Sequence, residues 1–116
     1  MKILLDECVT KKLKRHLNEF EVRTVVEMGW SGYRNGTLLR VAVEAEFDLL
    51  LSIDKNIVHQ QNMAKYDIAV VVFDTQRSKV EVLLNFLPEF KSRIHEFSRQ
   101  QISLLEATNI ESNLEH

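Results

Sequence analysis

Short apolar runs alternate with segments of helical periodicity along this chain. The apolar runs cover residues 2–5, 21–26, 48–52, 68–73 and 101–105. Runs of four to six residues rich in Leu, Ile and Val are typical of buried strands. Between them, apolar residues recur three and four positions apart, which predicts helices. Strands that alternate with helices predict one parallel sheet of four to five strands flanked by helices, an α/β fold.

Turn and capping residues divide the predicted helices. Thr10 precedes the first helix and Asn35 begins the second, and both are residues that cap helix N-termini. The pattern over residues 56–66 is ambiguous, and within it residues 58–63 predict a short helix. Residues 80–97 predict a long helix, which Pro88 should kink or restart because proline lacks the backbone N–H of a helix interior.

Length and composition indicate a single domain of ordinary size. Of the 116 residues, we assign 1–106 to the domain, 107–113 to a loose tail and 114–116 to a tag remnant. The formal net charge of −2 means that nucleic-acid binding would require a local basic patch. Cys8 is the only cysteine, and no apolar run approaches a membrane span. We therefore expect a cytoplasmic protein with no membrane segment.

Acidic residues follow several of the predicted strands. Asp6 and Glu7 follow the first strand, Asp54 follows the third, and Asp74 follows the fourth. Right-handed crossovers between parallel strands bring the carboxyl ends of the strands to one edge of the sheet. We expect these acids, together with Asn35 at the start of the second helix, to lie along that edge.

A cluster of carboxylates at one edge is stable when a cation neutralises it. Mg²⁺ and Mn²⁺ prefer oxygen ligands, and such an ion can orient water for attack on a phosphodiester. The chemistry then predicted is phosphodiester hydrolysis at Asp6 and Asp54. The alternative interpretation is that both residues only cap the following helices.

Two further polar segments are candidate binding surfaces. The first is a basic run in the first helix, which would contact RNA phosphates or an acidic partner, or else form a solvated helix face. It consists of Lys11, Lys12, Lys14 and Arg15. The second includes Gln61 and Asn62, which are polar enough to bind a base or a phosphate, or to end a solvated helix.

Several short segments together carry a family resemblance. They are Ile3-Leu4-Leu5-Asp6-Glu7-Cys8, the basic helix, Glu27-Met28-Gly29-Trp30-Ser31-Gly32, Asn35-Gly36 and Ser52-Ile53-Asp54-Lys55-Asn56. In their order and spacing, over about residues 1–105, they resemble the PIN-like toxin family, small bacterial proteins similar to VapC-type ribonucleases of toxin–antitoxin pairs.

The resemblance implies a PIN-like three-layer sandwich that cleaves RNA with Mg²⁺ or Mn²⁺. It also implies control by a small antitoxin and a homodimer. Asp6 and Asp54 would bind the metal, and Glu7, Asn35 and Asn56 would complete the catalytic set. Asn35 and Asn56 stand where the family commonly has acids, which predicts a weakened metal site that Glu7 could compensate.

Two other functions compete with this interpretation. A phosphoacceptor receiver domain also has an acid pair after its first strand and an Asp after its third, but nothing basic follows residues 101–105 here. A non-catalytic PIN-like binding module would instead use Trp30, Tyr33 and the basic helix as an interface.

Overall fold

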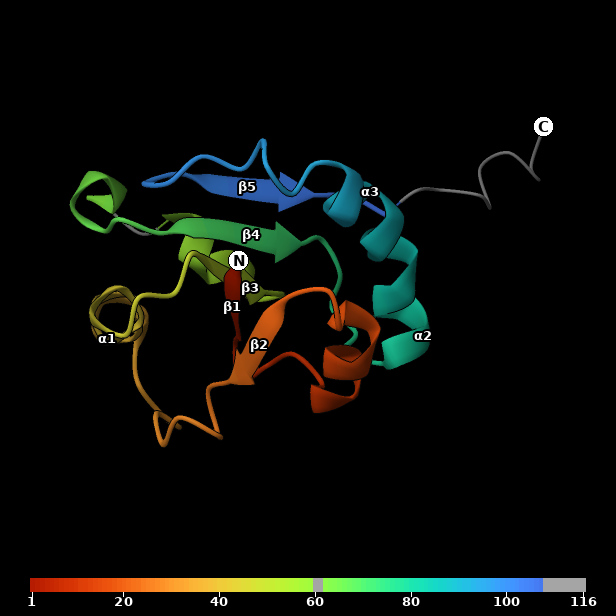
Figure 1. The fold of residues 1–116 in the computed structure, drawn as a ribbon, viewed down its shortest axis with the longest axis horizontal. Helices are drawn as coiled ribbons and strands as arrows, with labels where there is room; N and C mark the ends of the chain where they lie inside the picture. Colours follow the sequence, from red (N-terminus) through yellow and green to blue (C-terminus); the bar gives the residue numbers. More distant parts are fainter. Residues whose placement is uncertain (60–61, 108–116) are drawn as a thin grey trace.

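A five-stranded sheet in which all neighbouring strands are parallel forms the centre of the molecule. The computed structural model describes residues 1–59 and 62–107. The strands are β1 (Lys2–Leu5), β2 (Glu21–Thr24), β3 (Leu49–Ser52), β4 (Ala69–Phe73) and β5 (Ile102–Leu105), in the spatial order β2-β1-β3-β4-β5 (Figure 1). The α/β class and all five predicted strands are confirmed. The second strand is shorter than predicted, because the chain turns after Thr24.

The helices are short, and four of them are 3₁₀ helices, labelled η. The helical segments are η1 (Lys11–Leu17), α1 (Asn35–Glu44), η2 (Lys55–His59), η3 (Met63–Lys65), α2 (Val80–Leu83), η4 (Leu84–Phe86) and α3 (Leu87–Ser92). The predicted single helix over 80–97 is wrong in its extent, since it is three segments that end at Ser92. The predicted restart is confirmed, because Pro88 lies in the first turn of α3, where no intrahelical N–H is needed.

The two predicted caps have different outcomes. Thr10 caps η1, and its Oγ1 accepts a hydrogen bond from the Lys12 backbone N at 3.3 Å. The Asn35 cap was wrong, because Asn35 is already the first residue of α1 and Arg34 occupies the cap position without a side-chain hydrogen bond. The basic residues three and four apart in η1 repel one another, which disfavours a regular α-helix there.

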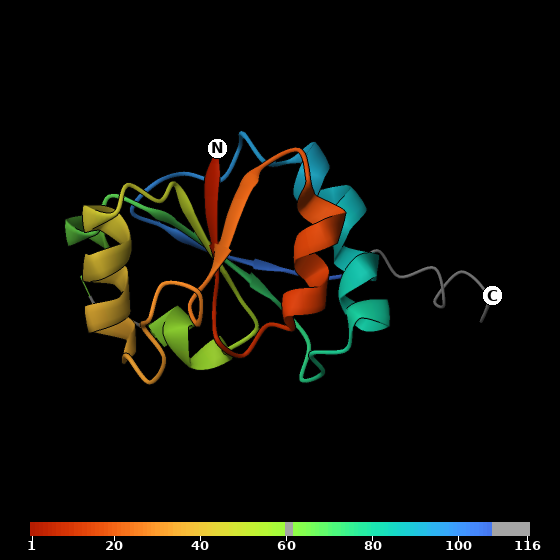
Figure 2. The ribbon, with the colours of Figure 1, turned by 60° about the horizontal axis from the view of Figure 1, so that its bottom comes forward.

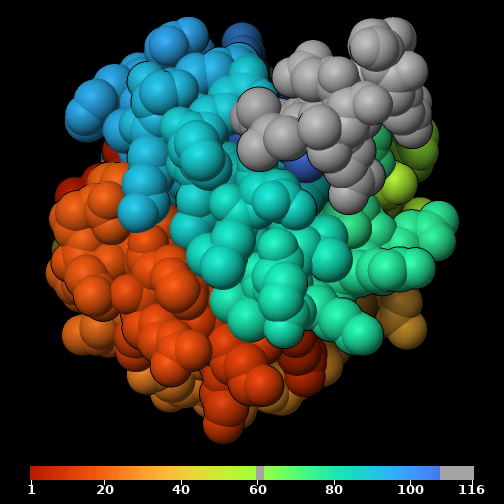
Figure 3. Space-filling model, turned by 90° about the vertical axis from the view of Figure 1, so that its right-hand side faces the viewer, coloured from red at the N-terminus to blue at the C-terminus, as the bar shows by residue number. Residues whose placement is uncertain are grey.

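Helices cover both faces of the sheet, and alternate strand residues face each side (Figures 1 and 2). On one face, Ile3, Leu51 and Phe73 pack with η1, α2 and α3. Figure 3 shows η1 and the α2–α3 segment side by side over this face. On the other face, Leu4 and Leu50 pack with α1 and η2.

Phenylalanines dominate the first of these two cores. Phe73, at the end of β4, stacks on Phe86 with ring centroids 4.6 Å apart, and Phe90 meets the Phe73 ring edge-on at 5.6 Å. Phe90 also stacks on Phe97 at 5.8 Å. These contacts hold the α2–α3 segment against the same face as η1.

This packing gives the crossover from β4 to β5 the opposite hand to the two crossovers before it. From β2 to β3, to β4 and to β5, the chain always moves across the sheet in one direction. It passes over the α1 face in the first two moves and over the η1 face in the last. Crossovers in one direction over opposite faces have opposite hands, so the expectation of right-handed connections throughout was wrong. The phenylalanine cluster is the physical reason.

Within residues 1–59 and 62–107, no helix combines the length and the apolar character that crossing a bilayer requires. The predicted tail after residue 107 and the predicted tag remnant at 114–116 lie outside the described residues.

Candidate functional site

The buried hydroxyl of Ser52 joins the ends of β1 and β3. Ser52 is the last residue of β3 and is 0% exposed. Its Oγ donates a hydrogen bond to Asp6 Oδ2 at 2.7 Å and accepts one from the Asp54 backbone N at 3.0 Å. Cys8 Sγ lies 3.5 Å from the same Oγ. Both predicted metal ligands therefore belong to segments fixed by one hydroxyl.

Asp6 is positioned by its own backbone as well as by Ser52. Its N–H donates to the Leu51 carbonyl at 2.9 Å, which continues the pairing of β1 with β3 by one residue. Its other carboxylate oxygen, Oδ1, accepts the Glu7 N–H at 2.7 Å. Each oxygen of the half-buried Asp6 carboxylate thus accepts a hydrogen bond and keeps lone pairs for a further ligand.

Asp54 begins η2. Its Oδ1 accepts the Asn56 N–H at 2.9 Å, and its carbonyl accepts the Ile57 N–H at 3.2 Å. The first of these bonds is a capping bond of the kind that the alternative interpretation expects. The carboxylate also lines a hollow of about 380 Å³ with Cys8 and Asn56, so capping does not remove it from the surface.

Glu7 connects the site to the loop after β2. Its Oε1 accepts the Gly32 N–H at 2.9 Å, and Gly32 has a φ of +82°, a conformation that favours glycine. Asp6 and Glu7 line a second hollow, of about 460 Å³, together with Thr10 and Lys11. The Gly32 bond therefore holds the loop after β2 against the acid pair.

A lysine lies among the acids of this edge. Lys55 Nζ is 2.6 Å from Asp74 Oδ1, and the Asp74 backbone N donates to the Leu105 carbonyl at 2.8 Å. Lys55 lines the same hollow as Asp54 and Asn56. Its positive charge therefore offsets part of the negative charge that the sequence alone predicts here.

The pKa of the Cys8 thiol reports its surroundings. Desolvation raises this pKa most, the hydrogen bond with Ser52 lowers it, and the negative charges of Asp6 and Asp54 raise it further. Cys8 is an exposed residue, yet its thiol stays protonated beyond the ordinary range. The negative charges of Asp6 and Asp54 therefore both act on the Cys8 sulfur.

Not all of the Asn and Gln residues predicted for the site lie beside Asp6 and Asp54. Asn56 lines the Asp54 hollow. Asn35 begins α1, and within the described residues no hydrogen bond links it to Asp6 or Asp54. Asn62 occupies the N-cap position before η3 with a φ of +63° and is exposed. Gln61 lies outside the described residues.

The donor set can be compared with the needs of a metal ion. Among residues 1–59 and 62–107, no three His, Cys, Asp or Glu side chains gather as a ready-made metal site. Mg²⁺ commonly binds through only one or two carboxylates plus waters and substrate phosphates. The Ser52 hydroxyl bonds the Asp6 carboxylate but only the backbone N–H of Asp54, and the two carboxylates line neighbouring hollows, so each could supply one oxygen ligand to an ion of that kind.

The basic residues of η1 divide into two groups. Lys14 Nζ lies 3.0 Å from Glu27 Oε2, and the Lys14 hydrogen bond lowers the pKa of Glu27. Lys11, Lys12 and Arg15 are exposed. Lys14 is therefore paired with Glu27 of its own chain. The other three basic residues predicted to bind RNA or an acidic partner lie at the surface.

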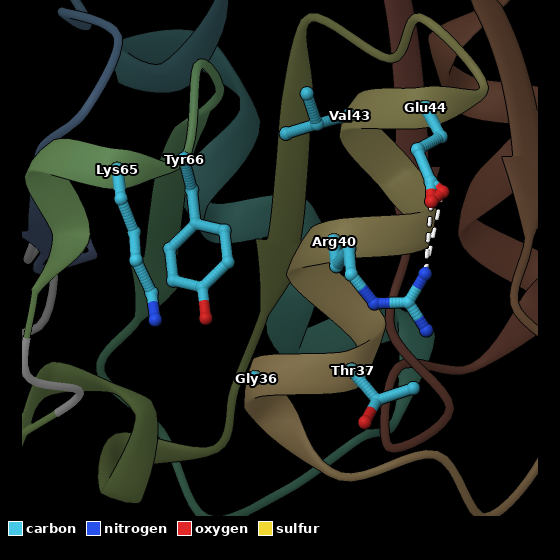
Figure 4. A pocket seen from close by; sticks show the side chains of 7 residues that line it. All are labelled: Gly36, Thr37, Arg40, Val43, Glu44, Lys65 and Tyr66. Atoms are coloured by element: carbon cyan, nitrogen blue, oxygen red, sulfur yellow. Dashed lines mark hydrogen bonds and ion pairs between the residues drawn. The ribbon is translucent and has the colours of Figure 1, made fainter.

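A further hollow lies elsewhere, between α1 and η3 (Figure 4). It has a volume of about 620 Å³, with Lys65 and Tyr66 on one wall and α1 on the other. Arg40 and Glu44 on α1 form an ion pair at 2.8 Å. None of these residues belongs to the predicted site, and none contacts Asp6 or Asp54 among the hydrogen bonds of the described chain.

No family model, curated protein or solved structure matches this chain. The site therefore has to be interpreted from its own chemistry.

Two residues of the site were missed by sequence reasoning. Ser52 had a signal, since it is a polar residue that ends a run of buried leucines. Lys55 lay inside the segment that carries the family resemblance but was given no role. Its partner Asp74 comes from β4, so the pair requires knowledge of which strands are neighbours.

Proposed function

We propose that this protein is a PIN-like ribonuclease dependent on Mg²⁺ or Mn²⁺, the toxin component of a toxin–antitoxin pair, with a weakened acidic site at Asp6 and Asp54. The observation that carries the proposal is the Ser52 hydroxyl, which bonds Asp6 at 2.7 Å and the Asp54 backbone at 3.0 Å. A buried hydrogen bond of this kind orients a carboxylate more firmly than surface contacts do.

Each residue of the site would have a separate role in RNA hydrolysis. Asp6 and Asp54 would hold the metal ion, which supplies a bound water as nucleophile and offsets negative charge on phosphorus. Asn56 would orient water or phosphate beside Asp54. Ser52 is a positioning residue, because it acts on RNA only through Asp6 and Asp54.

Lys55 gives the weakened site a second source of positive charge. Asn35 and Asn56 remove two carboxylates that the family resemblance leads one to expect, so metal affinity should be low. An ammonium group in the Asp54 hollow attracts the phosphate of a substrate without any metal. The exposed Lys11, Lys12 and Arg15 extend this attraction along η1, which predicts RNA binding that weakens steeply with salt.

The test measures Mn²⁺ binding by calorimetry and cleavage of structured RNA in the same buffers. Asp6→Asn and Asp54→Asn should each weaken Mn²⁺ binding at least tenfold and abolish cleavage. Asp67→Asn is the matched control, because Asp67 is an exposed carboxylate that precedes β4 at the opposite edge. Failure of the wild-type chain to bind millimolar Mn²⁺ would exclude the nuclease mechanism and favour a non-catalytic binding module.

The strand order is also that expected for a second function, a phosphoacceptor receiver domain. The order β2-β1-β3-β4-β5 is that of doubly wound phosphoacceptor domains. A regular sheet of that order would place the last helices over the α1 face, whereas α2 and α3 lie over the other. Acetyl phosphate with Mg²⁺ decides the matter, because a receiver would transfer the phosphoryl group to Asp54 and release acetate. An unchanged mass of the protein would exclude it.

A further inference from the structure

The backbone of β5 has one side paired and one side open. Within residues 1–59 and 62–107, β5 is an edge strand whose only neighbouring strand is β4. The carbonyls of Gln101 and Leu105 accept N–H groups from the β4 side, at 3.0 and 2.8 Å. In a parallel pair, alternate residues point toward the neighbour. The N–H and C=O groups of Ile102 and Leu104 therefore point away from the sheet.

The open side of β5 is also apolar on one face. Because the last crossover runs over the η1 face, α2 and α3 lie on the opposite face of the sheet from Leu104, which pairs with Val72 of the α1 face. Leu104 is 48% exposed, although η2 lies near the end of the strand. An apolar side chain and unpaired backbone groups thus occur at the same position.

The opposite edge of the sheet is protected against pairing. β2 presents Glu21 and Arg23 as exposed residues, which form an ion pair at 3.8 Å. Charged side chains on an edge strand oppose pairing with another strand. β5 has the sequence Ile-Ser-Leu-Leu, with no charge and no proline. One edge is therefore protected and the other is not.

We infer that the open edge of β5 pairs with β5 of a second copy of this chain, antiparallel about a twofold axis at Ser103. In this register Ile102 faces the partner's Leu104, so the outward backbone groups of both residues find partners. Residues 101–105 carry no charge, so no like charges meet. The first charges beyond them are Arg99 and Glu106, and Arg99 is paired with Asp48 and Asp67 of its own chain. A self-complementary segment of this kind fits its own copy.

This inference does not depend on the proposed ribonuclease activity. It concerns an edge of the sheet, and it would join two five-stranded sheets into one continuous sheet. The paired segment is short, and small interfaces give weak complexes. We therefore expect association that rises with protein concentration.

A cysteine at the twofold axis provides a direct test. Residues that face each other across a non-hydrogen-bonded antiparallel pair have Cα atoms about 4.5 Å apart, within the range of a disulfide. Ser103→Cys in a Cys8→Ser background should form a disulfide-linked dimer of twice 13.6 kDa under mild oxidation. The matched control is Arg23→Cys in the same background, which places the thiol on the protected edge.

Sedimentation equilibrium of the wild-type chain supplies the second measurement. The average mass should rise from 13.6 kDa with concentration, and Leu104→Lys should hold it at the monomer value while leaving the circular dichroism spectrum unchanged. Val26→Lys, at another exposed apolar residue, should associate like the wild type. A wild-type chain that stays monomeric, or a Ser103→Cys chain that links no faster than Arg23→Cys, would overturn the inference.

Discussion

Replacing Ser52 with alanine should destabilise the fold as well as the site. The substitution removes the bond to Asp6 Oδ2, at 2.7 Å, and the acceptor of the Asp54 N–H, at 3.0 Å. A hydrogen bond to a charged group contributes about 1.5–3 kcal/mol. An N–H left without its acceptor costs about 1–3 kcal/mol, toward the lower end here because Asp54 is only half-buried and water can reach it. We expect a loss of about 3 kcal/mol.

Urea unfolding followed by far-ultraviolet circular dichroism measures this loss. The midpoint should fall without a change in slope, because the surface exposed on unfolding is unchanged. Ser98→Ala is the matched control: Ser98 is exposed, so its substitution should shift the free energy of unfolding by less than about 0.5 kcal/mol. A loss below about 1 kcal/mol for Ser52→Ala would refute the argument that the hydroxyl fixes the two acids.

Four further predictions concern Cys8, Phe90 and Gly32. Because the pKa of Cys8 is raised, its alkylation by iodoacetamide, followed by mass spectrometry, should begin at higher pH in the folded chain than in urea; equal pH profiles would contradict this. The same shift stabilises the fold below the thiol's unfolded pKa and is lost as pH rises through the folded value, so Cys8→Ala should flatten the alkaline fall in stability. Phe90→Ala should cost about 3–5 kcal/mol in urea unfolding, because the ring is 0% exposed between two other phenylalanines; a loss below 2 kcal/mol would mean that the stack is not a tight core. Gly32→Ala should cost about 1 kcal/mol, because its φ is +82°, and an unchanged thermal midpoint would show that the loop adopts another conformation.

Sequence reasoning predicted the strands well because each is a compact apolar run, and the three central strands β1, β3 and β4 are buried on both faces. It could not predict how far the helices extend. Residues 80–97 keep apolar spacing throughout, but the α-helix ends at Ser92 and the chain turns before Phe97. Phe97 is buried by stacking on Phe90, and a contact of this kind produces helical spacing without a helix.

Sequence reasoning could place the residues of the candidate site along the chain, but it could not identify their partners in space. Asp6 and Asp54 follow strands, and the parallel sheet brings those strand ends to one edge, as predicted. The partners of these residues depend on strand order, which no local pattern determines. Lys55 meets Asp74 because β3 and β4 are neighbours, and Ser52 reaches Asp6 because β3 lies beside β1.

The order of synthesis gives the phenylalanine cluster a further consequence. Asp6, Ser52 and Asp54 leave the ribosome well before Phe86 and the residues that follow it. Until then Phe73, which ends β4, lacks the ring that stacks on it at 4.6 Å. A chain released early would carry the acids of the site without the core that aligns their strands. The site can therefore take its final geometry only when the last third of the polypeptide has been made.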